Sequence, residues 1–311
     1  MKIAYLDAYP LGSDIDITPL KTLGDYTSYD RTNENNLIER AAGAEVLLTN
    51  KCIISADTLD SLPNLKYIGV TATGFNIVDT KAAKERGIIV TNASDYSSNS
   101  VAQHVFAMIL RIQNQTYEHS NVDKWVNSSD FCYFNSTINE ISGKTLGVVG
   151  FGGIGKKVVQ IAEAFGMHVL INKRTLDSTD KRMVELDELL TKSDYVSLHL
   201  PLTENNQEFI NESSLQKMKS NAIFINTARG GLVNEKELAD ALNNNIIGGA
   251  ALDVLSAEPP SADNPLLKAK NCLITPHIAW GSYEARQKLL NIVVENIRAY
   301  QQGEPINVVN R

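Results

Sequence analysis

A glycine-rich turn near the middle of the chain most constrains the fold. Residues 147–159 read GVVGFGGIGKKVV and place Gly150, Gly152 and Gly155 in the spacing G-x-G-x-x-G. The turn follows an apolar run and opens a run with helical periodicity. In such a strand, turn and helix, the first glycine permits the turn, the second lets a pyrophosphate approach the backbone, and the third allows close helix packing. The context therefore favours a dinucleotide-binding turn over a purely structural glycine turn.

Short apolar runs alternate with amphipathic runs on both sides of this turn. The alternation predicts an α/β fold with parallel sheets covered by helices, and the length of 311 residues suits two domains. We expect strands at residues 2–7, 45–50, 65–72, 88–92, 145–150, 168–172, 194–200, 222–228 and 249–254. We expect helices at residues 34–42, 78–86, 100–125, 153–166, 184–193, 213–220, 234–245 and 281–303, and irregular structure at 127–140.

Composition limits the class of partner and the compartment. The net charge of −7 gives no electrostatic reason to expect nucleic acid or an anionic membrane, and no run approaches the roughly 20 apolar residues that span a bilayer. The first residues lack a secretory signal core. The three cysteines, Cys52, Cys132 and Cys272, are widely spaced and odd in number, which argues against a disulfide framework. We therefore predict a cytoplasmic protein.

The strand after the glycine turn bears on the choice of dinucleotide. Folds selective for NAD usually carry an acidic residue about 20 residues after the motif, where it binds the ribose. Here the strand ends in Asn172, Lys173, Arg174 and Thr175, with no carboxylate. The two basic side chains could pair with a 2′-phosphate, although basic residues at a strand end are often merely solvated. NADP is the preferred cofactor, and NAD remains possible.

Three polar stretches at strand ends in the second half could carry chemistry. They are INTARGG around Arg229, LDVLSAEPP around Asp253 and Glu258, and LITPHIAWG around His277. If they converge, a histidine can exchange a proton, a carboxylate can favour its imidazolium form, and an arginine can bind a substrate carboxylate. That set suits hydride transfer on a 2-hydroxy acid. Each residue also has a structural alternative: a buried histidine, a loop cap and a surface ion pair.

The other histidines give weaker signals. His104 lies in the apolar helical run VAQHVFAMIL and is expected in the core or at a domain interface. His199 ends the strand YVSLHL before Pro201, where lining the cofactor pocket and a structural role are equally plausible. No two histidines have metal-ligand spacing on one element and no C-x-x-C occurs, so no metal site is predicted.

Taken together, the order GFGGIG, NTARGGLVNEKEL, ALDVLSAEPP and TPHIAW resembles the D-isomer-specific 2-hydroxyacid dehydrogenases along essentially the whole chain. The resemblance implies two doubly wound domains: a flavodoxin-like substrate-binding domain of residues 1–98 and 282–311, and a Rossmann dinucleotide-binding domain of residues 99–281 inserted between its two parts. The late position of the glycine turn then marks the start of the inserted domain.

The resemblance also implies roles for individual residues. Arg229, Glu258 and His277 match the family's catalytic residues, and Asp253 matches the aspartate expected to contact the nicotinamide carboxamide. The loop VTATGFNIVD matches the substrate loop, so substrate would be bound by Thr73, Gly74, Arg229 and His277. The cofactor-binding residues are predicted as Gly150, Gly152, Gly153, Ile154, Gly155, Lys173, Arg174, Thr175, His199, Pro201, Thr227, Ala228, Arg229, Asp253 and His277.

Within the family, the chain resembles the glycerate dehydrogenase or hydroxypyruvate reductase group. Because no basic residue occurs from Gly69 to Asp79, an unphosphorylated acid such as hydroxypyruvate or glyoxylate is expected as the substrate. Reduction of D-lactate-type or phenylpyruvate-type 2-oxo acids is an alternative, as is a dinucleotide-sensing protein similar to the C-terminal-binding corepressors. Family members are commonly homodimers, and residues 117–140 are a candidate interface arm.

Overall fold

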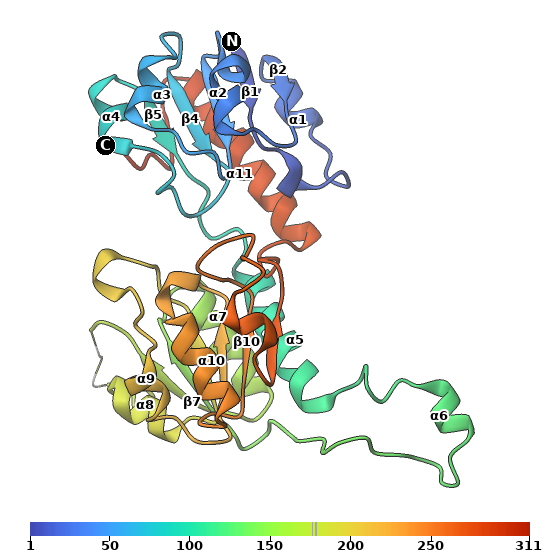
Figure 1. Ribbon diagram of the computed structural model, residues 1–311. Helices are drawn as coiled ribbons and strands as arrows, with labels where there is room; N and C mark the ends of the chain where they lie inside the picture. The colour runs from blue at the N-terminus through green and yellow to red at the C-terminus, as the bar shows by residue number, and fades with distance from the viewer. Residues whose placement is uncertain (176, 178) are drawn as a thin grey trace. The chain divides into compact units, whose positions relative to one another are not determined.

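The computed structural model describes residues 1–175, 177 and 179–311. The chain divides into two compact units (Figure 1). Unit 1 comprises Met1–Ser97 and Gly281–Arg311, and unit 2 comprises Ser98–Trp280. Unit 2 thus begins at Ser98, where the sequence predicted Asn99, and ends at Trp280, where it predicted Gly281. Among the helices of the described residues, none has the length and apolar character needed to cross a membrane.

Unit 1 contains a parallel five-stranded sheet in the order β2-β1-β3-β4-β5, which is the flavodoxin-like order. The strands are β1 (Lys2–Tyr5), β2 (Asp25–Ser28), β3 (Val46–Thr49), β4 (Tyr67–Val70) and β5 (Ile89–Thr91). The helices are α1 (Thr18–Lys21), α2 (Glu34–Ala41), α3 (Ala56–Asp60), α4 (Thr80–Glu85) and α11 (Tyr283–Gln301). β3 and β4 are buried along their whole length, as expected for central strands covered on both faces.

The C-terminal segment returns to unit 1 through buried amide contacts. Asn296 on α11 is 2% exposed, and its Nδ2 donates to the Asn92 carbonyl at 3.0 Å. Asn307 Nδ2 in turn donates to Asn296 Oδ1 at 2.7 Å, and Val309 N donates to the Val90 carbonyl at 2.9 Å. Buried polar groups need partners, so these bonds fix the returning segment beside β5.

Unit 2 contains a parallel six-stranded sheet in the order β11-β10-β9-β8-β6-β7. The strands are β6 (Thr145–Val149), β7 (His168–Asn172), β8 (Tyr195–Leu198), β9 (Ile223–Asn226), β10 (Gly249–Leu252) and β11 (Cys272–Ile274). The helices are α5 (Ser98–Asn114), α6 (Val122–Val126), α7 (Gly153–Ala164), α8 (Leu186–Lys192), α9 (Glu212–Leu215) and α10 (Glu235–Asn243).

Two apolar cores cover the two faces of this sheet. Phe224 belongs to one core, with residues of α8, α9 and α10, and its neighbour Ile225 belongs to the other, with residues of α5 and α7. Successive strand residues point to opposite faces, so helices on both sides bury every residue of the inner strands β8, β9 and β10. Both sheets are therefore doubly wound, as predicted.

One row of paired residues aligns the carboxyl ends of the strands in unit 2. The pairing runs from β7 through β6, β8, β9 and β10 to β11 at Asn172, Val149, Leu198, Asn226, Leu252 and Ile274. We call this row the carboxyl edge of unit 2. The strand order reverses between β6 and β8, which makes that part of the edge the topological switch point where ligands bind in such sheets.

All strands expected from the sequence are present, but one predicted helix is wrong. The helix expected at 100–125 ends at Asn114, because Gln115 takes a left-handed conformation with φ 48°. The separate α6 follows after a break. β2 escaped prediction because it is a short edge strand that is exposed at most positions and lacks an apolar run.

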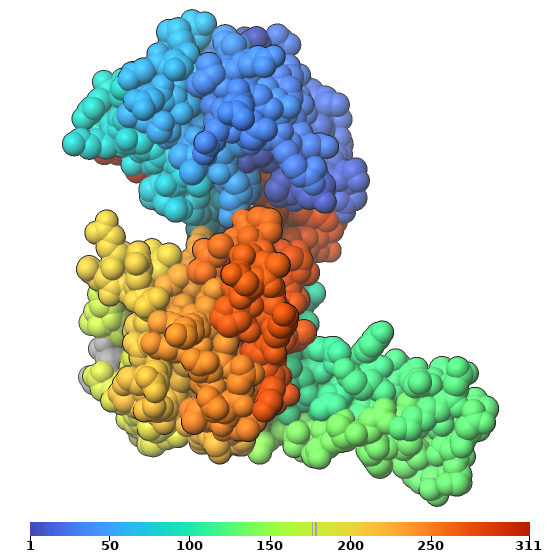
Figure 2. Space-filling view, in the orientation of Figure 1, coloured from blue at the N-terminus to red at the C-terminus, as the bar shows by residue number. Residues whose placement is uncertain are grey.

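Residues 115–140 form an arm that extends away from the body of unit 2, as Figures 1 and 2 show. The arm is internally bonded: Trp125 Nε1 donates to the Phe131 carbonyl at 2.9 Å, and the Tyr133 hydroxyl donates to the His119 carbonyl at 2.9 Å. Its exposed large apolar side chains are Tyr117, Val122, Trp125, Val126, Phe131, Phe134 and Ile138. Seven exposed large apolar side chains on one otherwise polar segment are unusual for a surface facing water.

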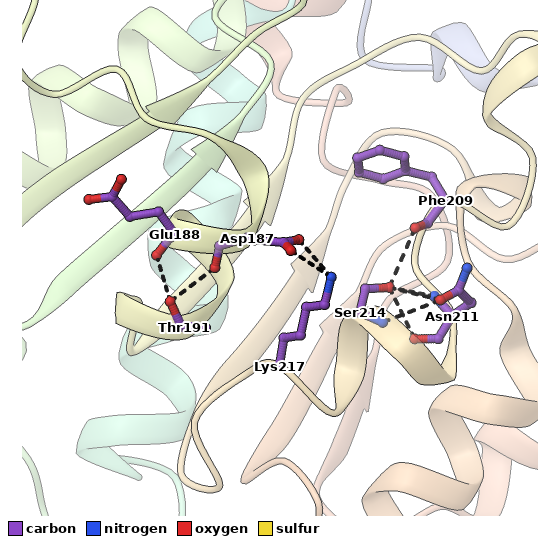
Figure 3. A network of polar contacts seen from close by, with 7 residues as sticks. All are labelled: Asp187, Glu188, Thr191, Phe209, Asn211, Ser214 and Lys217. Atoms are coloured by element: carbon purple, nitrogen blue, oxygen red, sulfur yellow. Dashed lines mark hydrogen bonds and ion pairs between the residues drawn. The ribbon is translucent and has the colours of Figure 1, made fainter.

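Figure 3 shows polar contacts that join α8 to the segment around α9. Lys217 Nζ lies 2.7 and 2.8 Å from the two carboxylate oxygens of Asp187. Asn211 caps α9 by accepting from Ser214 N at 3.3 Å, while the Ser214 hydroxyl contacts Asn211 and the Phe209 carbonyl. The ion pair is largely exposed and contributes at most about 1 kcal/mol. Lys217 is therefore a suitable control position for substitutions elsewhere in unit 2.

Candidate active site

The carboxyl edge of unit 2 gathers the predicted site residues. The residues that directly follow its row are Gly150, Lys173, His199, Thr227, Asp253 and Thr275. All but Thr275 were predicted to bind the cofactor. Since loops at the carboxyl ends of parallel strands share one side of the sheet, this register brings segments from distant parts of the sequence together.

The glycine turn is built by close backbone contacts. Gly150 has φ 102°, and a Cβ atom there would lie 2.4 Å from the His199 carbonyl oxygen. A Cβ atom on Gly155 would lie 2.2 Å from the Gly150 carbonyl oxygen, so neither position admits a side chain. Around Gly152, by contrast, the space is open, and this residue begins α7 without a side-chain cap. The exposed start of a 12-residue helix is thus available to an anionic group.

The loop after β9 offers a second feature that fits a ligand. Thr227 is 8% exposed, and its hydroxyl is buried without a hydrogen-bond partner among the described residues. The Asn226 side chain shapes this loop, because its Nδ2 donates to the Arg229 carbonyl at 2.9 Å and its Oδ1 accepts from Ala228 N at 3.0 Å. An orphaned hydroxyl and an open helix start, both following strand ends at the carboxyl edge of unit 2, fit a bound dinucleotide.

Arg229 and Glu258 lie on loops that touch. A Cβ atom on Gly230 would lie 1.9 Å from the Leu255 carbonyl carbon, so the two loops meet at a glycine. Glu235, the first residue of α10, accepts from Ser256 N at 2.5 Å and from Asn264 Nδ2 at 2.7 Å. Its carboxylate thereby ties down the loop that carries Glu258.

His277 and Glu258 form a direct pair. His277 Nδ1 lies 2.6 Å from Glu258 Oε2, and Glu258 Oε1 accepts from Leu255 N at 3.2 Å. The side chains are 26% and 31% exposed, so a ligand can reach them. With Nδ1 engaged by the carboxylate, Nε2 is the ring nitrogen that can exchange a proton with a ligand.

Asp253 performs a task that the sequence did not predict. Its carboxylate is 1% exposed and receives Thr275 Oγ1 at 2.5 Å, Ile278 N at 2.9 Å and Ala279 N at 2.8 Å. These donors belong to the turn that carries His277. The predicted contact with a carboxamide stays a prediction, and no spacing in the sequence would have revealed this use of the side chain.

His199 is partly buried behind the glycine turn. Its backbone N donates to the Val149 carbonyl at 2.7 Å, and its Nε2 lies 2.9 Å from the Ser197 hydroxyl. Desolvation by burial lowers the pKa of His199 to about 3 from an ordinary value of 6.5. The ring is therefore neutral at physiological pH and supports the turn.

The end of β7 carries both signs of charge. Lys173 is partly buried, and Arg174 and Thr175 are exposed. Hydrogen bonds from Arg182 lower the pKa of Asp180 to about 2, with a smaller contribution from the charge of Lys173. Hydrogen bonds from Thr179 and the same lysine charge lower the pKa of Asp177. The predicted basic site therefore also has carboxylates nearby.

The remaining predicted cofactor residues also follow strand ends. Gly153 and Ile154 lie in the first turn of α7, and Ala228 and Arg229 lie after β9. Pro201 is exposed after β8, and its carbonyl accepts from Asn206 Nδ2 at 2.8 Å. The Arg229 side chain is exposed, with Nη1 donating to the Ala228 carbonyl at 2.7 Å.

The predicted substrate loop lies in unit 1, directly after β4. Thr73 Oγ1 donates to the Ala93 carbonyl at 3.0 Å, and the Thr73 carbonyl accepts from Asn92 Nδ2 at 2.8 Å. Within the part of the chain that the structure describes, the N–H groups of Thr73 and Gly74 have no acceptor. The loop is thus held by its side chain and carbonyl while its N–H groups stay available.

Comparison with known proteins identifies the family. The sequence model of the D-isomer specific 2-hydroxyacid dehydrogenase, NAD binding domain, matches residues 106–279. The chain belongs to the D-isomer-specific 2-hydroxyacid dehydrogenases. It is 41% identical to a hydroxypyruvate reductase of Blautia hydrogenotrophica, with 100% of both chains covered. It is also 41% identical to a glycerate dehydrogenase of Methylorubrum extorquens, with 99% and 98% covered.

A solved structure shares the fold of the whole chain. An acyclic imino acid reductase in complex with NADPH and D-Arg superposes with a TM-score of 0.87 at 32% identity, covering 99% of this chain and 100% of that chain. This D-2-hydroxyacid dehydrogenase is therefore an oxidoreductase that acts on the CH–OH group and uses a nicotinamide dinucleotide to reduce 2-oxo acids. The matched NAD-binding domain lies within unit 2, around the open glycine turn.

The depressed pKa of His199 predicts a pH-dependent stability difference. Below pH 6.5 the unfolded chain binds a proton at His199 that the folded chain does not bind, so this residue lowers the free energy of unfolding as the pH falls toward 3. His199→Gln keeps an N–H donor but cannot take up the proton. We expect the wild type to lose stability relative to the variant by about 1 kcal/mol per pH unit below 6.5. Urea unfolding at pH 7, 5.5 and 4.5 measures this difference, and a gap independent of pH would contradict it.

Proposed function

We propose that this dehydrogenase reduces hydroxypyruvate or glyoxylate to the D-2-hydroxy acid. His277 is the proton donor, Glu258 orients it, and Arg229 binds the substrate carboxylate. The observation that carries the proposal is the 2.6 Å contact between His277 Nδ1 and Glu258 Oε2, on loops that begin at the carboxyl edge of unit 2.

The proposed chemistry follows from this pair. The Glu258 carboxylate holds His277 at Nδ1, and Nε2 gives a proton to the oxygen of the 2-oxo group. The nicotinamide, when bound, supplies the hydride. The exposed Arg229 guanidinium can hold the carboxylate of the substrate by two hydrogen bonds and polarise the adjacent carbonyl. For the loop of Thr73 and Gly74 in unit 1, the role in binding substrate stays a prediction from the family resemblance.

The substrate class is supported by the loop and by the relatives. Residues 69–79 contain no basic side chain, and the relatives named above act on hydroxypyruvate and glycerate. Lys51 is a basic residue outside residues 69–79 that follows a residue in contact with this loop. The neighbouring Asn50 donates its Nδ2 to the Thr71 carbonyl at 2.7 Å. A substrate panel must therefore include a phosphorylated 2-oxo acid.

Turnover of a substrate panel tests the proposed reaction. We expect loss of NADPH absorbance to be fastest with hydroxypyruvate or glyoxylate, slower with pyruvate, phenylpyruvate and 3-phosphohydroxypyruvate. His277→Asn should lower kcat by about 10²-fold to 10⁴-fold, because it removes the proton donor. Lys217→Ala serves as the control, with unchanged turnover. Either of two results would refute the proposal: a folded His277→Asn variant with near-normal turnover, or a wild type that turns over none of the 2-oxo acids.

We further propose NADP as the preferred cofactor, with Lys173, Arg174 and Thr175 binding the 2′-phosphate. The partly buried Lys173 at the end of β7 supports this, while Asp177 and Asp180 nearby favour the alternative, NAD. Losing one charge-assisted hydrogen bond reduces affinity by about tenfold or more.

The cofactor preference can be measured directly. For Lys173→Asp we expect the KM for NADPH to rise at least about tenfold, while the KM for NADH stays within a factor of two. Steady-state kinetics with both cofactors and a saturating 2-oxo acid give both values. A wild type that prefers NADH, or a variant that loses both cofactors equally, would overturn this assignment.

We also propose a cytoplasmic homodimer in which the arm of residues 115–140 packs against a second copy. The support is the run of exposed apolar side chains, of which Phe131 is 89% exposed. The three free thiols suit a reducing compartment.

Solution mass tests the dimer. Light scattering should give twice the chain mass of 34.2 kDa for the wild type and a shift toward one chain mass for the double variant Phe131→Ser, Phe134→Ser. Both side chains are exposed, so their replacement should leave each chain folded. A monomeric wild type, or a dimer insensitive to the double variant, would contradict the role of the arm.

A further inference from the structure

We propose that His104 on α5 is a positioning residue for His277, acting through Thr275 and Asp253. The proposal rests on the proposed role of His277 as proton donor. The contacts of the His104 ring are to Thr275 and Asp253, so its effect passes through the turn that carries His277.

The turn that carries His277 needs support. His277 has φ 53°, a left-handed conformation that is uncommon for a residue with a side chain. Its backbone N donates to the Asp253 carbonyl at 2.8 Å and contacts the Thr275 carbonyl at 3.0 Å. Such a conformation persists only where the surrounding structure holds it in place. The direction of the imidazole therefore depends on what fixes residues 275–279.

Asp253 fixes this turn from inside. Its buried carboxylate accepts the hydroxyl of Thr275 before His277 and the N–H groups of Ile278 and Ala279 after it. One side chain thus holds residues on both sides of His277, a side chain before it and the backbone after it. A buried carboxylate with three donors is well solvated by the protein and has little freedom to move.

α5 holds the same turn at its two ends. Ser100 Oγ donates to the Ala279 carbonyl at 2.6 Å, and His104 Nε2 lies 3.0 Å from Thr275 Oγ1 and 3.5 Å from Asp253 Oδ1. Ser100 and His104 are four residues apart on one helix and so share a face. This face therefore spans the turn from Thr275 to Ala279.

The hydrogen bonds also define the tautomer of His104. Thr275 has one hydroxyl hydrogen, and the 2.5 Å contact directs it to the Asp253 carboxylate. The Thr275 oxygen can then only accept from His104, so Nε2 of His104 carries a hydrogen. His104 thus donates to Thr275, and Thr275 donates to Asp253, whose carboxylate also accepts from the N–H groups of Ile278 and Ala279. We call this series of hydrogen bonds the donor chain.

A merely structural role for His104 would be filled by an aromatic ring of similar size. His104→Phe keeps a planar ring in the core and removes the donor, whereas His104→Gln keeps an N–H donor at the position of Nε2. We expect His104→Phe to lower kcat about tenfold for the fastest 2-oxo acid, because small displacements of a catalytic group are costly. The KM for that acid, the Kd for NADPH and the melting temperature should stay close to the wild type, and His104→Gln should recover most of kcat.

A second pair of variants keeps the test valid if His104→Phe does not fold. Thr275→Val breaks the donor chain at its middle, and Thr275→Ser restores the hydroxyl. We expect Thr275→Val to lower kcat like His104→Phe, the double variant to be no worse than either single variant, and Thr275→Ser to act like the wild type. Lys217→Ala is again the control.

Three outcomes would overturn the proposal. One is a wild-type kcat in folded His104→Phe or Thr275→Val. Another is a loss of kcat in His104→Phe that comes with weaker NADPH binding and a lower melting temperature, and that His104→Gln does not recover. The third is additive losses in the double variant. If His277→Asn has normal turnover, the proposed function fails instead, whatever the His104 variants do.

Discussion

The shared register of the six parallel strands in unit 2 is the constraint on which the site depends. It aligns the last paired residues of all strands in one row, from Asn172 on β7 to Ile274 on β11. Two apolar cores on opposite faces fix this register, because a slip of one residue would exchange the side chains of the two faces. The glycine turn and the loops of Arg229, Glu258 and His277 then start from a common edge.

Beyond that edge, buried and half-buried polar side chains hold the loops in place. Asn226 shapes the loop of Arg229, Glu235 ties down the loop of Glu258, and Asp253 holds the turn of His277. Each contact pairs a backbone N–H or carbonyl that would otherwise be left without a partner at a partly buried edge. The exposed groups proposed to meet the substrate are thus supported by side chains that do not meet it.

The sequence predicted most of the strands, the glycine turn and the three polar stretches, because these depend on local periodicity and on residue types at fixed spacing. It failed where long-range contacts decide. The end of α5 at Asn114 follows from the left-handed conformation of Gln115, whereas the sequence predicted that the helix continues to residue 125. The contact of His104 with Thr275 joins residues 171 positions apart, so no spacing could reveal it.

Helix α5 connects the turn that carries His277 to the arm of residues 115–140. Its first turns contact the turn of His277 through Ser100 and His104, and its last residue, Asn114, leads into the apolar arm. From His104 to Asn114 the helix advances about 15 Å, and a helix packed along this length moves as one body. Val101, Val105 and Ile109 on α5 are buried, so the helix is fixed to unit 2 between these two ends. Because this core anchors α5 independently of the arm, the donor chain of His104 can keep its geometry in a single chain, and the positioning of His277 does not require a second copy.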